Sequence, residues 1–310
     1  MDRHTVRRPR TADAPAVHEL VSTYDISVIG LPDVTLDDIA DELGELDTER
    51  DAWLAEDDAG TLNGWAWIIP KGDSDEADVE VVVRPGTGDG VTDGLWAAVM
   101  ERSRQLAAER GHEGLTLDIG VYRADEDKQA LVKGLGFAPA TSFHRLGIDF
   151  DGPVEAPEPP DGVTLHPALT DELRREAHRI HQEGFADHFG FVPLPYEEWL
   201  GRRQASAATD WSQVLVARVD GEPAALLVGT NHFADDENRG YVFTLATLPA
   251  FRGRGLGRFL LRTAFAADAA RGRRGTLLQV DANNTTPALG LYTSAGMRPV
   301  LVIDVWRRRL

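Results

Sequence analysis

The chain has 310 residues, 42% of them hydrophobic, a formal net charge of −19 at pH 7 and no cysteine. This length can bury one large core or two ordinary ones, and the lack of cysteine excludes disulfides, thiolate metal sites and cysteine nucleophiles. Acidic residues outnumber basic ones 51 to 32, which disfavours nucleic acid as a partner because such binding needs an extended basic face.

The first fifteen residues have no apolar centre, and no apolar stretch approaches membrane-spanning length. We therefore expect a cytoplasmic protein with no membrane partner.

The first half of the chain predicts an alternation of strands and helices. Residues 5–21 indicate a short strand, a proline and an amphipathic helix, and residues 50–70 indicate two strands around a glycine-containing turn. Residues 78–111 then predict a strand, a glycine-rich turn and a long helix. A further strand at 115–120 and helix at 128–137 complete the series.

A proline- and acid-rich stretch, "DFDGPVEAPEPPDGV" at 149–163, is typical of a linker. After it the same order returns: a strand, proline and helix at 163–180, two strands at 212–229, and a strand, turn and helix at 240–272. We therefore predict two diverged copies of one α/β unit, at 1–150 and 163–310, joined by a linker at 151–162. The helical crossing to the strand "TLLQVD" implies a parallel neighbour, so each copy should hold a mixed, mostly antiparallel sheet flanked by helices.

The turn in the second copy, "RGRGLG" at 252–257, follows a strand directly and opens a helix. Free amide groups and the positive end of the helix dipole converge there, which suits a phosphate or pyrophosphate. Glycine allows close approach and positive φ, and the arginines add counter-charge. A plain glycine-rich connection with solvated arginines would look similar.

This Arg-x-x-Gly-x-Gly pattern resembles the acyl-CoA pyrophosphate loop of the GNAT superfamily of N-acetyltransferases. The downstream stretch "VDANNTTPALGLYTSAGM" is similar to the later strand and helix of that family, with Asn284, Tyr292 and Gly296 at the matching positions. The resemblance implies two tandem GNAT-like domains, similar in arrangement to the mycothiol synthase branch, and a monomer that forms a pseudo-dimer of domains.

The resemblance implies direct attack of an amine on the thioester of acetyl-CoA, without an acyl-enzyme intermediate. Tyr292 would act as the general acid that protonates the departing thiolate. The strand before the turn would bind the pantetheine arm and polarise the thioester oxygen. The residues expected to bind acetyl-CoA are Leu245, Ala246, Thr247, Arg252, Gly253, Arg254, Gly255, Leu256, Gly257, Arg258 and Asn284.

The general base is not evident from the sequence. Many relatives carry a glutamate on the strand that leads to the turn, and this chain has Tyr241 at about that place. Other candidates are Glu183, Asp187 and His188. We assign no metal, because histidines on one helix and its end, as at 178, 181 and 188, are more often surface residues. The acceptor stays open among small-molecule amines and peptide N-termini.

The first copy has lost the residues of this chemistry. Alignment of Pro85 with Pro249 places Gly88, Val91 and Asp93 opposite Arg252, Gly255 and Gly257. A β-branched residue at a positive-φ position and a carboxylate near a pyrophosphate both oppose binding. Val132 stands where the second copy has Tyr292. We therefore predict one active site, in the second copy; the alternative is a non-catalytic acyl-CoA-binding regulatory protein.

Overall fold

The structure is a computed structural model that describes residues 4–186, 188–282 and 288–310. The chain divides into two compact units. The first consists of Met1–Ser142 with Ile303–Leu310, and the second of Phe143–Val302.

The first unit is a sheet with helices on both faces. Its sheet order is β1-β2-β3-β4-β5-β12, antiparallel except for the parallel pair β4 and β5. Its strands are β1 (His4–Arg7), β2 (Ala52–Asp57), β3 (Leu62–Pro70), β4 (Glu76–Val83), β5 (Thr116–Tyr122) and the end of β12 (Arg298–Arg309). Its helices are η1 (Thr11–Asp13), α1 (Ala14–Ile29), α2 (Leu36–Glu45), α3 (Asp89–Glu109) and α4 (Glu126–Gly134).

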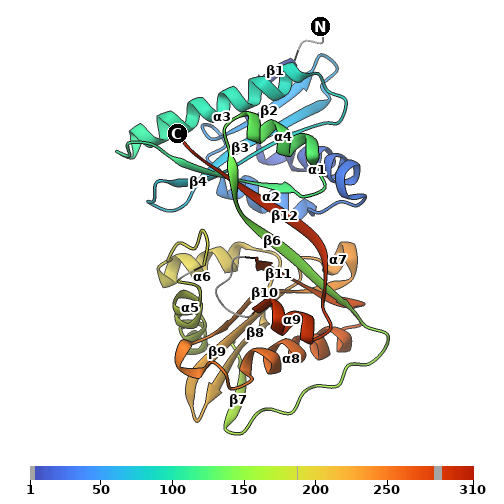
Figure 1. Ribbon diagram of the computed structural model, residues 1–310, viewed down its shortest axis with the longest axis vertical. Helices are drawn as coiled ribbons and strands as arrows, with labels where there is room; N and C mark the ends of the chain where they lie inside the picture. The colour runs from blue at the N-terminus through green and yellow to red at the C-terminus, as the bar shows by residue number, and fades with distance from the viewer. Residues whose placement is uncertain (1–3, 187, 283–287) are drawn as a thin grey trace. The chain divides into compact units, whose positions relative to one another are not determined.

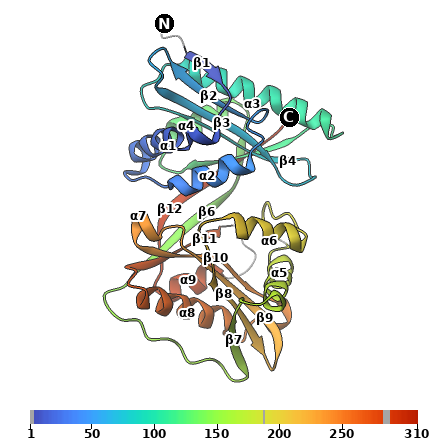
Figure 2. The same ribbon diagram turned by 180° about the vertical axis from the view of Figure 1, so that it is seen from behind.

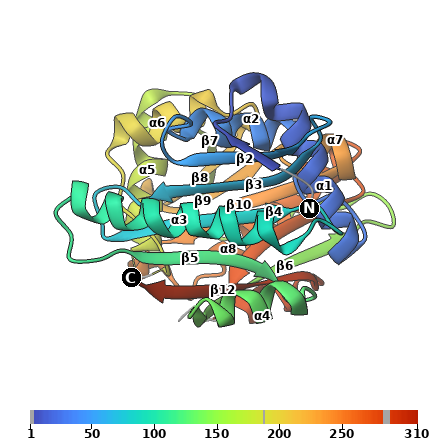
Figure 3. The ribbon, with the colours of Figure 1, turned by 90° about the horizontal axis from the view of Figure 1, so that it is seen from above.

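Local sequence explains how these elements form and which face they cover. A capping box at Thr35 and Asp38 starts α2, and the alternating burial of β4 gives it one fully buried face, formed by Ala77, Val79 and Val81. α3 and α4 contribute to one core cluster, whereas α1 and α2 contribute to another. Figure 3 shows α3 lying along β4 and β5.

The second unit repeats this plan. Its strands are β7 (Val163–Pro167), β8 (Thr209–Val219), β9 (Glu222–Thr230), β10 (Arg239–Thr247), β11 (Gly275–Asp281) and the end of β6 (Ala138–Asp149). Its helices are α5 (Asp171–Phe185), α6 (Tyr196–Ala205), α7 (Ala234–Glu237), η2 (Pro249–Phe251), α8 (Leu256–Ala270) and α9 (Ala288–Ser294). α8 and α9 share one core cluster and lie side by side in Figures 1 and 2, and α5 and α6 share another. The predicted fold class, a mixed sheet flanked by helices, is confirmed.

The last strand of each repeat pairs outside that repeat. Residues 143–149 of β6, the last strand of the first repeat, pair with β11 in the second unit. Residues 303–309 of β12, the last strand of the second repeat, pair with β5 in the first unit. Leu146 and Trp306 are buried in the cores that these strands complete. The compact units follow this pairing, and the division into residues 1–150 and 163–310 stays a prediction about the sequence repeats.

The predicted linker contains no helix or strand, since β6 ends at residue 149 and β7 begins at residue 163. Among residues 4–186, 188–282 and 288–310, no helix is both long and apolar enough to cross a bilayer.

Candidate active site

A cleft of about 900 Å³ opens in the second unit where β10 and β11 separate. The two strands pair in parallel from Arg239 with Gly275 to Val242 with Leu278, and the described residues beyond Val242 form no further pair between them. A one-residue bulge at Phe243 shifts the register of β10 against β9 at the same point. The far ends of both strands therefore line a wedge whose volume suits a small-molecule ligand.

The backbone of β10 has one free edge along this wedge. The N–H of Leu248 donates to the Ala224 carbonyl of β9 at 2.9 Å, and backbone direction alternates along a strand. The peptide groups of Ala246 consequently face β9, while those of Leu245 and Thr247 face the wedge. The Thr247 carbonyl accepts a hydrogen bond from Arg252 Nε at 3.3 Å, in agreement with this direction.

The side chain of Ala246 has a separate role in shaping the cleft. A Cβ built on Gly184 of α5 would lie 2.9 Å from the Ala246 Cβ. Glycine at 184 therefore lets α5 pass close to β10, and both residues line the cleft.

The predicted anion turn forms the other end of the cleft. Gly253 and Gly255 have φ of 77° and 79°, the left-handed region that favours glycine. A Cβ at either position would meet no atom within 4 Å, so backbone conformation, not crowding, calls for glycine here. α8 begins at Leu256, directly after Gly255. Its first amide groups have no partner inside the helix and line the cleft with the positive end of the dipole.

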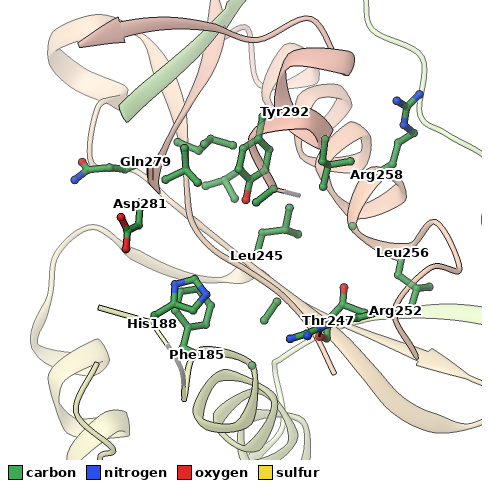
Figure 4. A pocket seen from close by; sticks show the side chains of 18 of the residues that line it. Phe185, His188, Leu245, Thr247, Arg252, Leu256, Arg258, Gln279, Asp281 and Tyr292 are labelled. Carbon is green, nitrogen blue, oxygen red and sulfur yellow. Dashed lines mark hydrogen bonds between the residues drawn. The ribbon is translucent and has the colours of Figure 1, made fainter. Parts of the chain in front are cut away.

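The arginines of the turn do not all lie in the cleft. Arg252 and Arg258 are among its lining residues, but the Arg258 guanidinium donates to the Ser294 hydroxyl at 2.6 Å and points away from the centre in Figure 4. Arg254 is missing from the described lining, and its guanidinium lies 5.4 Å from the centre of the Phe251 ring. Arg252 is therefore the arginine of the turn best placed toward a ligand.

Tyr292 lies in the wall formed by α9. Its side chain is 8% exposed, and its hydroxyl points into the middle of the cleft, toward Leu245 (Figure 4). Burial raises the pKa of this hydroxyl to about 12. The phenol is therefore protonated at neutral pH and is a hydrogen-bond donor.

The remaining wall combines aromatic and titratable side chains. His188, Gln279 and Asp281 lie together on the side of the cleft opposite Arg252 (Figure 4). The His188 ring lies 4.2 Å from the ring of Phe185. Tyr241 also lines the cleft. These groups can hold a polar acceptor and accept a proton from it.

The other residues predicted from the sequence as a general base or as part of the acetyl-CoA site differ in where they lie. Glu183 is exposed on α5, whereas Asn284 and Asp187 lie outside the described residues. Gln279 and Asp281 were missed by the sequence reasoning. The available signal was a polar pair at the carboxyl end of a strand predicted to be parallel, where ligands of α/β sheets commonly bind.

The histidines of α5 are packed and do not form a surface row. His178 makes a 2.7 Å contact with the Leu194 carbonyl through its Nε2. Burial lowers the pKa of His181 to about 4, so that imidazole is neutral at pH 7. Over the part of the chain that the structure describes, no group of three metal-ligating side chains is assembled.

The corresponding turn of the first unit is built differently. β4 ends at Val83 and α3 begins at Asp89, so five residues connect them, whereas the eight residues 248–255 connect β10 to α8. Val91, aligned with Gly255, lies inside α3 and is buried in the core. Val132, aligned with Tyr292, is also buried.

The model of the acetyltransferase (GNAT) family matches residues 170–297. Mycothiol acetyltransferase of Thermobispora bispora is 31% identical over 259 residues, which cover 81% of each chain, and that of Catenulispora acidiphila is 26% identical over 306 residues, covering 94% of each.

Solved structures share the fold. A GCN5-related N-acetyltransferase from Sphaerobacter thermophilus superposes with a TM-score of 0.83 at 24% identity, covering 100% of this chain and 96% of the other. A tandem GNAT protein from the clavulanic acid biosynthesis pathway superposes with a TM-score of 0.74 at 17% identity, covering 99% and 98%.

Proposed function

The chain belongs to the GNAT acetyltransferase family, and from this premise we propose that it transfers the acetyl group of acetyl-CoA to a primary amine in the cleft of its second unit. The observation that carries the proposal is the separation of β10 from β11, which exposes a strand edge between the amino end of α8 and the Tyr292 hydroxyl. The acetyltransferase activity follows from the family; the donor, the acceptor class and the single site are the proposal.

Acetyl-CoA would lie along the wedge with its pyrophosphate at the turn. The amide groups at the start of α8 and the Arg252 guanidinium supply donors and positive charge for phosphate oxygens. The free edge of β10 supplies hydrogen bonds for the amide groups of the pantetheine arm, as an added strand would receive them. Asn284 and Arg254 keep their proposed roles in acetyl-CoA binding on sequence grounds alone.

The acetyl group would then lie beside Leu245. The amine nitrogen attacks the thioester carbonyl carbon, and the carbonyl oxygen gains negative charge as the tetrahedral intermediate forms. The Leu245 N–H, which faces the wedge, is positioned to donate to this oxygen. A fixed backbone donor of this kind stabilises the transition state without reorganisation.

Tyr292 would assist the departure of the thiolate. As the carbon–sulfur bond breaks, the sulfur gains the electron pair and the phenol donates a hydrogen bond, then its proton. Full transfer is uphill, because the pKa of the phenol is about 12 and that of an ordinary thiol is about 8.5. The hydrogen bond to the developing thiolate is therefore the first contribution, and the proton lost by the amine restores the phenol.

His188 and Asp281 are the residues we propose for the amine's proton. Both line the cleft on the side away from the turn, and imidazole and carboxylate are the usual general bases of enzymes. The Asp281 carboxylate also attracts an acceptor amine that is still protonated and therefore cationic. Tyr241 also lines the cleft, at about the place where many relatives have glutamate, so we propose that the acceptor amine of this chain differs from that of such relatives.

The experiment is an acetyl-CoA turnover assay against a panel of amines. The panel includes the acceptor of mycothiol acetyltransferases, because proteins of that name are similar over most of the chain, together with aminoglycosides, polyamines, amino acids and peptides. We expect release of free thiol with at least one amine, at a rate that Tyr292→Phe lowers. Tight acetyl-CoA binding without turnover of any amine would favour a regulatory acyl-CoA-binding protein instead.

A further inference from the structure

A second cavity, of about 210 Å³, lies wholly in the first unit, where β4 and β5 separate. β4 and β5 pair in parallel only from Glu76 with Thr116 to Asp78 with Asp118 within the described residues. The space is room for roughly seven water molecules at ~30 Å³ each. It is therefore too small for acetyl-CoA but large enough for a small organic molecule.

Aromatic rings form much of the wall of this first-unit cavity. Tyr24 of α1 and Tyr122 of β5 stack with ring centres 6.3 Å apart, and Trp65 and Trp67 of β3 also line the space. The Trp67 indole N–H is buried and directed toward the Glu42 carboxyl, but among the described residues it makes no hydrogen bond of 3.5 Å or shorter. Ring faces attract cations, and an unpartnered donor favours a ligand that carries an oxygen acceptor.

Carboxyl groups outnumber cations in the same wall. Asp25, Glu42 and Glu80 line the cavity, against one ammonium, that of Lys128. Ionisation of all four groups would leave a net charge of −2 in a partly enclosed space, which is costly without a further cation.

The ammonium group of Lys128 is a cation that the walls of this cavity already hold. Its Nζ lies 2.6 Å from Glu80 Oε1 and 5.0 Å from the centre of the Tyr24 ring. An ammonium ion is thus already held by one carboxylate and one ring face. Among the described residues no cation pairs with Glu42; its Oε1 accepts a 3.1 Å hydrogen bond from the indole N–H of Trp65.

We propose that the first-unit cavity binds a small organic ammonium ion that carries a hydroxyl group, held between the aromatic rings and the Glu42 carboxylate. The inference does not rest on the acetyltransferase site, which lies in the second unit. Burial raises the pKa of Glu42 to about 8 and that of Asp25 to about 6. A bound cation lowers such a pKa, so binding at pH 7 releases a proton from Glu42.

The test is calorimetry of the intact chain with choline and with 3,3-dimethylbutan-1-ol, its neutral carbon analogue. We expect choline to bind in the millimolar range or tighter and the neutral analogue at least about tenfold more weakly, as for an interaction with a charged group. Titrations in buffers of different ionisation heat should show proton release on choline binding. Equal affinity for the two compounds, or no choline binding in the millimolar range, would overturn the proposal.

Matched variants locate the site. Glu42→Gln keeps an oxygen for Trp65 but removes the charge, and should weaken choline binding about tenfold. Glu45→Gln removes an exposed carboxylate from the same helix and should leave choline binding unchanged. Lys128→Met removes the competing cation and should strengthen binding, a gain that a misfolded variant could not produce. Equal effects of the two glutamine variants, or weaker binding by Lys128→Met, would contradict a cation site here.

Discussion

The turns at 84–88 and 248–255 connect equivalent strands to equivalent helices, yet the glycine directly before the helix is extended in the first, Gly88, and left-handed in the second, Gly255. Both are rich in glycine, and both contain a glycine with positive φ: Gly86 in the first, Gly253 and Gly255 in the second. The first turn is three residues shorter, and its helix begins early enough to bury Val91 in the core. The residues aligned with Gly253 to Gly257 lie in the first turns of α3 there, and the Val91 N–H donates to the Gly88 carbonyl at 3.2 Å.

The two turns therefore differ in their length and in the backbone conformation next to the helix, although both contain two glycines. The strands next to the two turns separate in both units, but the space between them differs, about 900 Å³ in the second unit and 210 Å³ in the first. In the first unit the Lys128–Glu80 ion pair and the Tyr24 ring line this smaller space.

The largest expected effect comes from cutting the chain between the two repeats. A fragment of residues 160–310 lacks residues 143–149, which pair with β11 and bury Leu146. We expect it to be insoluble or only partly folded, because an unpaired edge and a lost core leucine together cost several kcal/mol. A fragment of residues 143–302 should melt cooperatively and bind acetyl-CoA. Equal behaviour of the two fragments in thermal melting would show that the strand pairing is dispensable.

The next prediction concerns the left-handed glycines. Gly255→Val forces a β-branched residue to positive φ and moves the amides of α8, so acetyl-CoA affinity should fall about a thousandfold, from strain of ~1–2 kcal/mol and lost hydrogen bonds to charge. Gly86→Val imposes the same strain in the first turn and is the matched control. Calorimetry should find its acetyl-CoA affinity unaltered; equal losses in both variants would mean that general destabilisation explains the effect.

Tyr292 offers a smaller and purely kinetic effect. Tyr292→Phe should lower kcat about a hundredfold and leave acetyl-CoA binding nearly intact, because a general acid acts after binding. Tyr24→Phe alters a tyrosine in the first-unit cavity and should leave kcat unchanged. Steady-state kinetics of both variants would refute the role of Tyr292 if its kcat matched that of the wild type.

The last effect is on stability, and it comes from the first unit. The pKa of Glu42 is raised from 4.5 to about 8 by burial, so the native state binds this proton more tightly than the unfolded state. The stabilisation is complete below pH 4.5 and is lost as pH rises to about 8, at up to ~1.4 kcal/mol per pH unit. Asp25 adds to the same trend, and Glu80 and Lys128 face the same cavity.

Chemical denaturation of Glu42→Gln between pH 5 and 8 measures the contribution of Glu42 to the pH dependence of the unfolding free energy. We expect a flatter profile than that of the wild type, with the largest gain in unfolding free energy at pH 8. Glu45→Gln, on the exposed side of α2, should follow the wild type. Parallel profiles for the wild type and Glu42→Gln would exclude a proton held on this carboxyl group.

Local patterns explain why much of this architecture was predictable. The internal repeat, the strand–turn–helix around residues 252–257 and the mixed sheet all follow from periodicity and glycine spacing within short windows. The shorter connection in the first copy was not predicted, because a proline alignment shows which glycines are missing but not where a helix begins. Helix starts depend on capping and packing beyond the motif.

The pairing of β6 with β11 and of β12 with β5 could not be predicted from the sequence. β6 and β12 have similar alternating patterns, and either could pair with β5 or β11 on propensity alone, since strand partners are chosen by tertiary packing. The same limit applies to Asp281, whose place in the cleft depends on where β10 bulges away from β11. Tyr292, in contrast, could be proposed beforehand because its motif lies within one strand and helix.

The most direct test of one functional cleft in two similar units is the number of acetyl-CoA molecules bound by the intact chain. Isothermal titration calorimetry should give a single tight site, because only the second unit combines a wide wedge with left-handed glycines at the start of its helix. Two sites of equal affinity would contradict the account, since the short turn and small cavity of the first unit would then suffice to bind the same ligand.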